Sequence, residues 1–485
     1  MTPVRDLLSR IAYLSRVAPC FLGLSLGLTT SAGANPATRV RLDPVRPGEI
    51  QTGAVCSGGR FRCFAHVPAT ADGQIDPTAL PFGSADGRAQ VPAIDPAAAT
   101  AFGADDLRKA YNVPTTDIPA ATVAVVDAYG YATLEADLAA YRTAYGLPAC
   151  TTANGCLKIV NQTGATSPLP GPPPPGDDWT IETALDIDMV SAVCPSCKII
   201  VVQANDDTSD GLYTSQAIAA SLGATVINNS WGGSESGNAA LSLESYFDQP
   251  GIAIFASAGD SGYDDGGNGP EYPGTSAHVI SVGGTHLVAD ASTRGWTETA
   301  WSLGGSGCSL SIPKPAYQTD PTCGFKATTD IAAVGDPQTG VAYYNAGAFK
   351  SVGGTSVAAP IVAAIFAATG NGAQTSGDFV RQHASLLNDV LSGSNGTCGN
   401  ILCTAGLGWD GPTGYGTPNA QLLIPEAAAG MADAGVGGGG TPGGGGGGGT
   451  GSQEVTGGCS AGNHAGGLLP VVLGIAFAYR RRRRA

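Results

Sequence analysis

A serine surrounded by small residues stands at the start of an apolar stretch in the last third of the chain. Gly353-Gly354-Thr355-Ser356 leads into a run of small and apolar residues that contains Pro360, and proline is tolerated in the first turn of a helix. We therefore expect Ser356 to open a helix. Free N–H groups and the positive end of the helix dipole favour an oxyanion at such a place. Ser356 is thus a candidate nucleophile for acyl transfer, and a simple N-cap serine is the alternative.

Two carboxylates could supply the base that this serine would need. Glu182 and Asp186 lie four residues apart after the helix starters Asp178 and Thr180, so we expect them on one face of a helix. Two acids at this spacing repel each other on an exposed helix. If they are buried and share a proton, one pKa rises and the other falls, and the pair can accept a proton and return it.

A histidine base, the usual partner of a catalytic serine, has no convincing candidate. None of the chain's five histidines stands in a suitable sequence context; they are His66, His278, His286, His383 and His464. Asp127, at the end of the first predicted strand, has no histidine to orient, so we expect it to be structural. A histidine-dependent peptidase remains an alternative that removal of each histidine would test.

Taken together, these motifs resemble the sedolisins, the serine-carboxyl peptidases, over roughly residues 106–419. Ser356 lies in a G-T-S-x-x-A-P motif of the subtilisin clan, and Glu182 and Asp186 lie in an E-x-x-L-D motif. The resemblance implies a subtilisin-like α/β fold, a parallel sheet between helices, with Ser356 as nucleophile, Glu182 as general base and Asp186 as its orienting partner. It also implies that Asp260, in Ala256–Gly262, holds the oxyanion when protonated.

The same resemblance implies a substrate-binding segment and a calcium site. Ser230, Trp231 and Gly232 would align the substrate backbone as an added strand, although a Ser-Trp-Gly turn can also be purely structural. Calcium prefers several oxygen ligands, many of them backbone carbonyls at tight turns. The implied ligands are the carboxylates of Asp389 and Asp410 and the carbonyls of Val390, Gly406 and Gly408.

These features predict an acid-active endopeptidase that forms an acyl-enzyme on protein or peptide substrates, most simply as a monomer. The alternative is a catalytically inactive, surface-displayed binding protein on the same scaffold. Internal cleavage and removal of N-terminal tripeptides both remain open. The formal net charge of −15 argues against nucleic-acid binding through a basic surface.

The chain divides by composition into five segments. We predict a signal peptide over 1–34, a short leader over 35–104, the peptidase domain over 105–428, a glycine-rich linker over 429–457 and a C-terminal segment over 458–485. The last segment resembles the MYXO-CTERM sorting tails and implies processing near Cys459 and surface display. The leader is shorter than a sedolisin prodomain, so it is either a reduced inhibitor or activity is controlled otherwise.

The cysteines also indicate export. Ten of them form five neighbouring couples, which we expect to be local disulfides in an oxidising compartment. The couples are Cys56/Cys63, Cys150/Cys156, Cys194/Cys197, Cys308/Cys323 and Cys398/Cys403. Cys194 and Cys197 also have metal-site spacing, but no second ligand pair is near them. We therefore predict a secreted or cell-surface protein.

Overall fold

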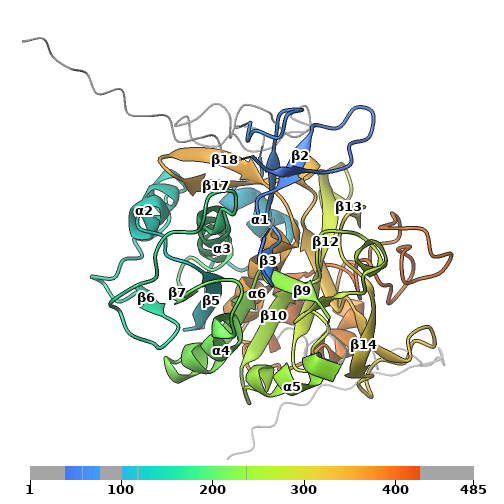
Figure 1. The fold of residues 1–485 in the computed structure, drawn as a ribbon. Helices are drawn as coiled ribbons and strands as arrows, with labels where there is room; N and C mark the ends of the chain where they lie inside the picture. The colour runs from blue at the N-terminus through green and yellow to red at the C-terminus, as the bar shows by residue number, and fades with distance from the viewer. Residues whose placement is uncertain (1–38, 57, 77–100, 117–118, 236–237, 426–485) are drawn as a thin grey trace, which may run out of the picture. The chain divides into compact units, whose positions relative to one another are not determined.

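The computed structural model describes residues 39–56, 58–76, 101–116, 119–235 and 238–425, and within them the core is a mostly parallel sheet. Its strands follow the order β13-β12-β10-β8-β5-β7-β6, with β16 added beside β12 (Figure 1). The strands are β5 (Thr122–Ala128), β6 (Leu157–Asn161), β7 (Lys198–Ala204), β8 (Val226–Asn229), β10 (Ala253–Ser257), β12 (Ile280–Ala289), β13 (Trp296–Ala300) and β16 (Ile331–Val334). Only β13 pairs antiparallel within this described sheet.

Helices cover both faces of the sheet, which is the usual arrangement for parallel strands. Helices α3 and α6 pack together and contact the central strands, whereas α4 packs on β5 and β7 and also contacts α5 (Figure 1). The helices are α1 (Ala104–Ala110), α2 (Leu134–Ala144), α3 (Trp179–Val193), α4 (Gly211–Ser221), α5 (Asn238–Phe247), α6 (Thr355–Ala368) and α7 (Asp378–Gln382). The subtilisin-like α/β architecture expected from the sequence is confirmed.

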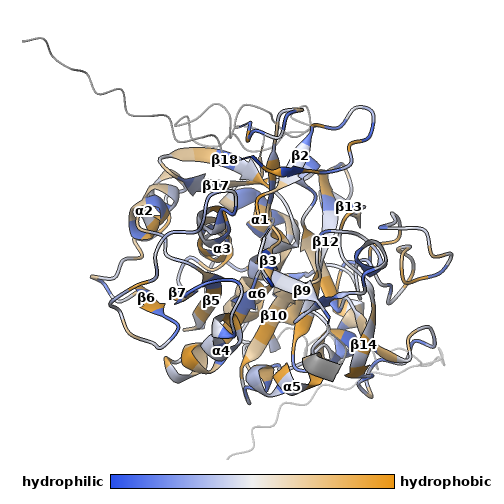
Figure 2. Cartoon of the chain, viewed as in Figure 1, coloured by the Kyte–Doolittle hydropathy of each residue, from blue (hydrophilic) through white to orange (hydrophobic). Residues whose placement is uncertain are grey.

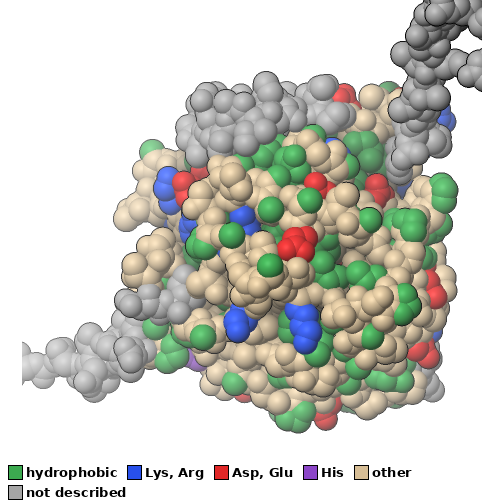
Figure 3. Space-filling view, turned by 90° about the vertical axis from the view of Figure 1, so that its left-hand side faces the viewer, with side chains coloured by type: hydrophobic (Ala, Val, Ile, Leu, Met, Phe, Trp, Pro, Cys, Tyr) green, Lys and Arg blue, Asp and Glu red, His purple; other side chains and the backbone are tan. Residues whose placement is uncertain are grey.

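Hydropathy follows this layering. The central strands and the inner helices carry the apolar side chains, and α6 is buried along its whole length (Figure 2). On the face shown in Figure 3, Lys and Arg side chains stand apart from one another among neutral side chains. No helix in the described ranges is long and apolar enough to span a bilayer.

The described part of the leader, residues 39–76, is built from short strands. β1 (Arg41–Leu42), β2 (Thr52–Ala54) and β4 (His66–Pro68) form an antiparallel sheet. Between β2 and β4 the chain forms β3 (Arg62–Cys63), which lies beside β9 (Trp231–Ser234) (Figure 1). β9 belongs to the predicted peptidase domain, residues 105–428, which we call the catalytic unit below. The described residues of the leader thus pack as part of the fold.

Smaller strands complete the fold. β9 pairs with β11 (Glu271–Tyr272), β14 (Gly307–Pro313) with β15 (Phe325–Thr328), and β17 (Val341–Asn345) with β18 (Ala348–Val352). All five predicted cysteine couples, which lie within the described ranges, form disulfides, so this expectation is confirmed. The predicted signal peptide, linker and sorting tail lie outside the described residues.

Candidate active site

The candidate nucleophile lies at the N-terminus of the buried helix α6. The helix begins at Thr355, one residue before the predicted start, because Gly354 turns the chain sharply out of β18 with φ of 111°. A side chain at position 354 would collide with the leader, since a Cβ there would lie 1.8 Å from the carbonyl oxygen of Phe64. Ser356 is fully buried, and its Oγ donates to the Ser230 carbonyl at 3.1 Å.

The two predicted carboxylates lie together on α3, against α6. Asp178 caps the helix by accepting a hydrogen bond from the Thr180 N–H at 3.2 Å. Helix α3 is buried on nearly all sides rather than on one face only, so Glu182 and Asp186 are both fully buried. Burial, and then the neighbouring Asp186, raises the pKa of Glu182 well above its usual value, and the nearby Ser356 side chain opposes this rise. Among the described residues neither carboxylate oxygen of Glu182 accepts a hydrogen bond, because Ser356 Oγ donates to the Ser230 carbonyl instead. The structure therefore brings Ser356 and this acid pair into one site.

Asp186 is held by hydrogen bonds from the end of β8 and the following residue. Its Oδ1 accepts from Ser230 Oγ at 2.7 Å and its Oδ2 accepts from Asn228 Nδ2 at 2.8 Å. Burial and the nearby Asp127 raise the pKa of Asp186 well above normal, although both hydrogen bonds oppose this. These donors fix the positions of both Asp186 oxygens on the helix that also carries Glu182.

Asp127 contributes more to the site than the sequence reasoning assigned to it. Its carboxylate raises the pKa of both Glu182 and Asp186, and burial raises its own pKa to about 7. The sequence feature that could have pointed to Asp127 was its position near the carboxyl end of the parallel strand β5, where functional groups of α/β sheets gather. Asp127 lies close to the acid pair although it has no histidine partner.

Asp260 follows β10 and is tied to the start of α6. Its Oδ1 accepts hydrogen bonds from the Thr355 N–H at 2.8 Å and from Thr355 Oγ1 at 2.6 Å. A Cβ on Gly354 would lie 2.8 Å from Asp260 Oδ2 and still closer to the Phe64 carbonyl oxygen. Asp260 Oδ2 and the Phe64 carbonyl oxygen therefore both lie next to Gly354, two residues before Ser356.

The leader crosses the site along the predicted substrate-binding segment. β3 runs antiparallel to β9, pairing Arg62 with Gly232 and Cys63 with Trp231. The next N–H, of Phe64, donates to Ser356 Oγ at 3.0 Å and to the Ser230 carbonyl at 3.3 Å. Ser230, Trp231 and Gly232 thus align a peptide backbone in this structure, and that peptide belongs to the chain itself.

After Phe64 the leader continues along the strand that precedes the nucleophile. The N–H of His66 donates to the Gly353 carbonyl at 3.0 Å, and the Gly353 N–H donates back at 2.8 Å. The Phe64 carbonyl is therefore the one presented to Ser356, with backbone pairing on both sides of it.

A histidine that the sequence reasoning set aside touches the site. His66 Nδ1 lies 2.7 Å from Asp43 Oδ2, and its Nε2 lies 3.1 Å from Asp260 Oδ2. Burial by itself would lower the pKa of His66, but the two carboxylates outweigh it and raise the pKa to about 10. No local pattern marks His66, because both partners are distant in sequence.

The predicted calcium ligands come together in a loop region. Gly408 N–H donates to Asp389 Oδ2 at 2.8 Å, and Gly406 N–H donates to Asp410 Oδ2 at 2.9 Å. Asp389 Oδ1 is buried without a hydrogen-bond partner among the described residues, and burial raises the pKa of Asp410 to about 7. The part of the chain that is described holds no cluster of three or more His, Cys, Asp or Glu side chains suited to a metal. Two carboxylates with Val390 and glycine carbonyls nevertheless fit a calcium donor set.

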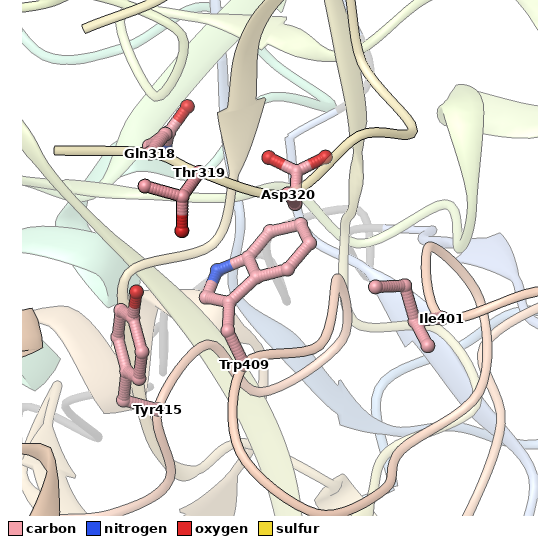
Figure 4. Close-up of a pocket in the computed structure, with 6 residues that line it drawn as sticks. All are labelled: Gln318, Thr319, Asp320, Ile401, Trp409 and Tyr415. Carbon is pink, nitrogen blue, oxygen red and sulfur yellow. The ribbon is translucent and has the colours of Figure 1, made fainter. Parts of the chain in front are cut away.

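A separate pocket of about 310 Å³ lies next to this loop region (Figure 4). It is lined by Gln318, Thr319, Asp320, Ile401, Trp409 and Tyr415. Its one carboxylate, Asp320, forms an ion pair with Lys314 at 2.9 Å. None of the carboxylates around Ser356 lines it, so it is distinct from the candidate active site.

Comparison with known proteins agrees with this geometry. Residues 176–387 match the family model described as "Subtilase family". The chain is 30% identical to kumamolisin of Bacillus sp. (strain MN-32) over 371 residues, 68% of this chain and 65% of the relative. It is 33% identical to sedolisin of Pseudomonas sp. (strain 101) over 183 residues, 33% of this chain and 31% of the relative. The chain thus spans less than two thirds of the length of these relatives.

A solved structure also supports the fold. Pseudomonas sedolisin, a serine-carboxyl proteinase complexed with two molecules of pseudo-iodotyrostatin, superposes with a TM-score of 0.58 at 24% identity. The match covers 68% of this chain and 98% of that structure. The similarity establishes the subtilisin-like fold.

Proposed function

We propose that this protein is a serine-carboxyl peptidase that hydrolyses peptide bonds through an acyl-enzyme on Ser356. The observation that carries the proposal is the position of the Phe64 carbonyl, which lies against Gly354, close to Asp260, with the Phe64 N–H on Ser356 Oγ. The Phe64 carbonyl is thereby placed next to the Ser356 hydroxyl, which lies close to the buried acids Glu182 and Asp186. Similarity to kumamolisin and sedolisin supports the same activity.

In the proposed cycle Glu182 takes the proton of Ser356 as Oγ bonds to the scissile carbonyl carbon, and the carbonyl electron pair moves onto oxygen. Protonated Asp260 and the Ser356 N–H hydrogen-bond to that oxyanion. The C–N bond then breaks, and Glu182 returns its proton to the leaving amine. Water attacks the acyl ester in the same way, which releases the new carboxylate and restores Ser356. Asp186 orients Glu182 and shares its proton. The preference for acidic pH comes from Asp260, which must carry a proton to donate to the oxyanion.

The leader fits the role of an inhibitor that occupies the cleft. Arg62, Cys63 and Phe64 pair along β9 and Ser230, and His66 pairs with Gly353, so a substrate cannot take the same path while they are bound. His66 Nε2 also lies 3.1 Å from Asp260 Oδ2, so the leader occupies the carboxylate that would otherwise face an oxyanion. We therefore assign the reduced-inhibitor role to the leader, with acid as the releasing condition.

The remaining features fit a secreted enzyme stabilised by calcium. Asp389, Asp410 and the carbonyls of Val390, Gly406 and Gly408 would hold one Ca²⁺, which would fix the two loops to each other. The disulfides suit an oxidising exterior. The proposed substrates are proteins or peptides, cleaved by a monomer.

The test is a peptide-library digest at pH 3–7, with products identified by mass spectrometry. Wild type should cleave, with most product at the acid end, whereas Ser356→Ala and Glu182→Gln should lose roughly 10²-fold or more of the rate. Asp188→Asn is the matched control, because this buried acid on the same helix accepts from the Tyr344 N–H instead and should retain activity. Equal cleavage by wild type and Glu182→Gln would remove the carboxylate base from the scheme, and no cleavage by wild type at any pH would favour the inactive binding protein.

A further inference from the structure

The leader holds a basic side chain over two buried carboxylates beside the cleft. Arg62 Nη2 lies 2.9 Å from Asp265 Oδ1 and 3.2 Å from Ser261 Oγ, and it also contacts Glu271 Oε1. The side chains of Asp265 and Glu271 are only 8% and 2% exposed. The guanidinium of Arg62 therefore occupies a site built by the catalytic unit.

The backbone that carries these carboxylates is fixed largely by the catalytic unit. Glu271 lies on β11, which pairs with Ser234 of β9. Its side chain fills the space left by Gly259, where a Cβ would lie 2.9 Å from Glu271 Cγ. Asp265 sits in the turn Asp264–Gly267 with φ of 43°, a left-handed conformation that few residues other than Gly, Asn and Asp adopt readily. The site should therefore keep its shape when another peptide replaces the leader.

An empty site of this kind would be costly. Burial is the largest influence on Glu271 and raises its pKa to about 7, although Arg62 opposes this shift. Glu271 Oε2 is buried and, among the described residues, accepts no hydrogen bond. Without a cation, Glu271 must either take up a proton or keep a buried charge that nothing balances, so a cation on an incoming substrate would be favoured there. A guanidinium, which can contact both acids at once, suits the site better than an ammonium.

We propose that Glu271 and Asp265 form a specificity site for a basic side chain, preferably arginine, two residues before the residue whose carbonyl Ser356 attacks. The position follows from the leader, where Arg62 pairs with Gly232 and Phe64 presents its carbonyl to Ser356. This inference rests on the proposed function, because it takes Phe64 as the residue before the scissile bond.

The kinetic test uses the acid-activated chain and two fluorogenic peptides that differ only at this position, Arg or Gln, with Phe before the scissile bond. In a His66→Gln version of this chain, whose leader docks weakly, we expect kcat/KM for the Arg peptide to exceed that for the Gln peptide about tenfold or more at pH 7, close to the pKa of Glu271. Glu271→Gln combined with Asp265→Asn should bring the ratio to about one. Asp264→Asn is the matched control, since Asp264 has the same left-handed backbone, and the hydrogen bonds and ion pairs of Arg62 in the described ranges go to other residues; it should keep the preference. Equal rates for the two peptides, or a preference that survives the double change, would overturn the proposal.

A second measurement needs no turnover and so separates this inference from the proposed function. In a Ser356→Ala chain, the leader should be cut faster by an added protease that does not recognise basic residues once Arg62→Gln is introduced, because the open form becomes more populated. Arg60→Gln is the control, since its ion pair with Asp210 at 3.0 Å is exposed and should contribute little. Equal cutting rates for the two variants would show that the acidic pair does not hold the basic side chain.

Discussion

Replacing His66 with glutamine should release the leader from the cleft. His66 is 3% exposed and lies between Asp43 and Asp260, and the pKa of its imidazole rises from 6.5 to about 10. At about 1.4 kcal/mol for each pKa unit, this shift corresponds to about 5 kcal/mol of preference for the bound, charged form. Breaking a buried ion pair typically costs about 3–5 kcal/mol. We therefore expect His66→Gln to weaken leader docking by about 3–5 kcal/mol.

The pH dependence of this docking has a definite sign. The folded pKa of His66 is raised, so its contribution is complete below 6.5 and is lost as pH rises through about 10. Burial opposes ionisation of Asp43, but the charge of His66 outweighs it and lowers the pKa below 3.8. The contribution of Asp43 is therefore present above about 3.8 and is lost as pH falls further. The leader should be held most firmly between about pH 4 and 6.5, and acid should release it.

The assay is amide hydrogen exchange of residues 61–66 at pH 6, in a Ser356→Ala chain that cannot cleave itself. We expect His66→Gln to speed exchange about a hundredfold to a few thousandfold. His286→Gln is the matched control, because His286 also pairs with an acid, Asp336 at 2.9 Å, but is 35% exposed and should change little. Unchanged exchange in His66→Gln, or an equal effect in His286→Gln, would refute the reasoning.

Three further predictions follow from the same geometry. Asp260→Asn should extend the activity of the acid-activated chain toward neutral pH in a pH–rate profile, because an amide donates to an oxyanion without needing a proton; an unchanged upper limit would contradict the assigned role. Calcium chelation should lower the melting temperature of wild type by several degrees but not that of Asp389→Asn, as calorimetry would show, and equal shifts would exclude this site. Cys56→Ser combined with Cys63→Ser removes one short disulfide loop and should destabilise the leader by about 2.5 kcal/mol by the chain-entropy relation. Denaturant melting of a Ser356→Ala chain with and without this double change measures the loss, and an unchanged midpoint would contradict it.

Local pattern was sufficient for the elements and for the strongest motifs. The first predicted strand, with Asp127 near its end, is β5, and the helix expected after Asp178 and Thr180 is α3, because hydrophobic period and capping residues act over short distances. Local spacing also gave the disulfide couples, which close short loops. The boundaries shifted by a residue or two, as at Thr355, where the conformation of Gly354 determines the helix start.

The site was only partly accessible in this way. Ser356, Glu182 and Asp260 were proposed from motifs, but the distances between their side chains depend on how α3, β10 and α6 pack. Asp127 looked structural because its influence on the acid pair acts through space, from a strand distant in sequence. His66 was set aside because its relation to Asp260 depends on the path of the leader.

The order of residues was enough to predict the small residues around the serine, the acid pair one helical turn apart and the cysteine couples, because these depend on covalent geometry and short-range periodicity. The path of the leader through the site, with Arg62 on an acidic pair and His66 on Asp260, could be seen only in the folded chain. Those contacts join segments about two hundred residues apart, and such pairings depend on packing and burial of the whole fold.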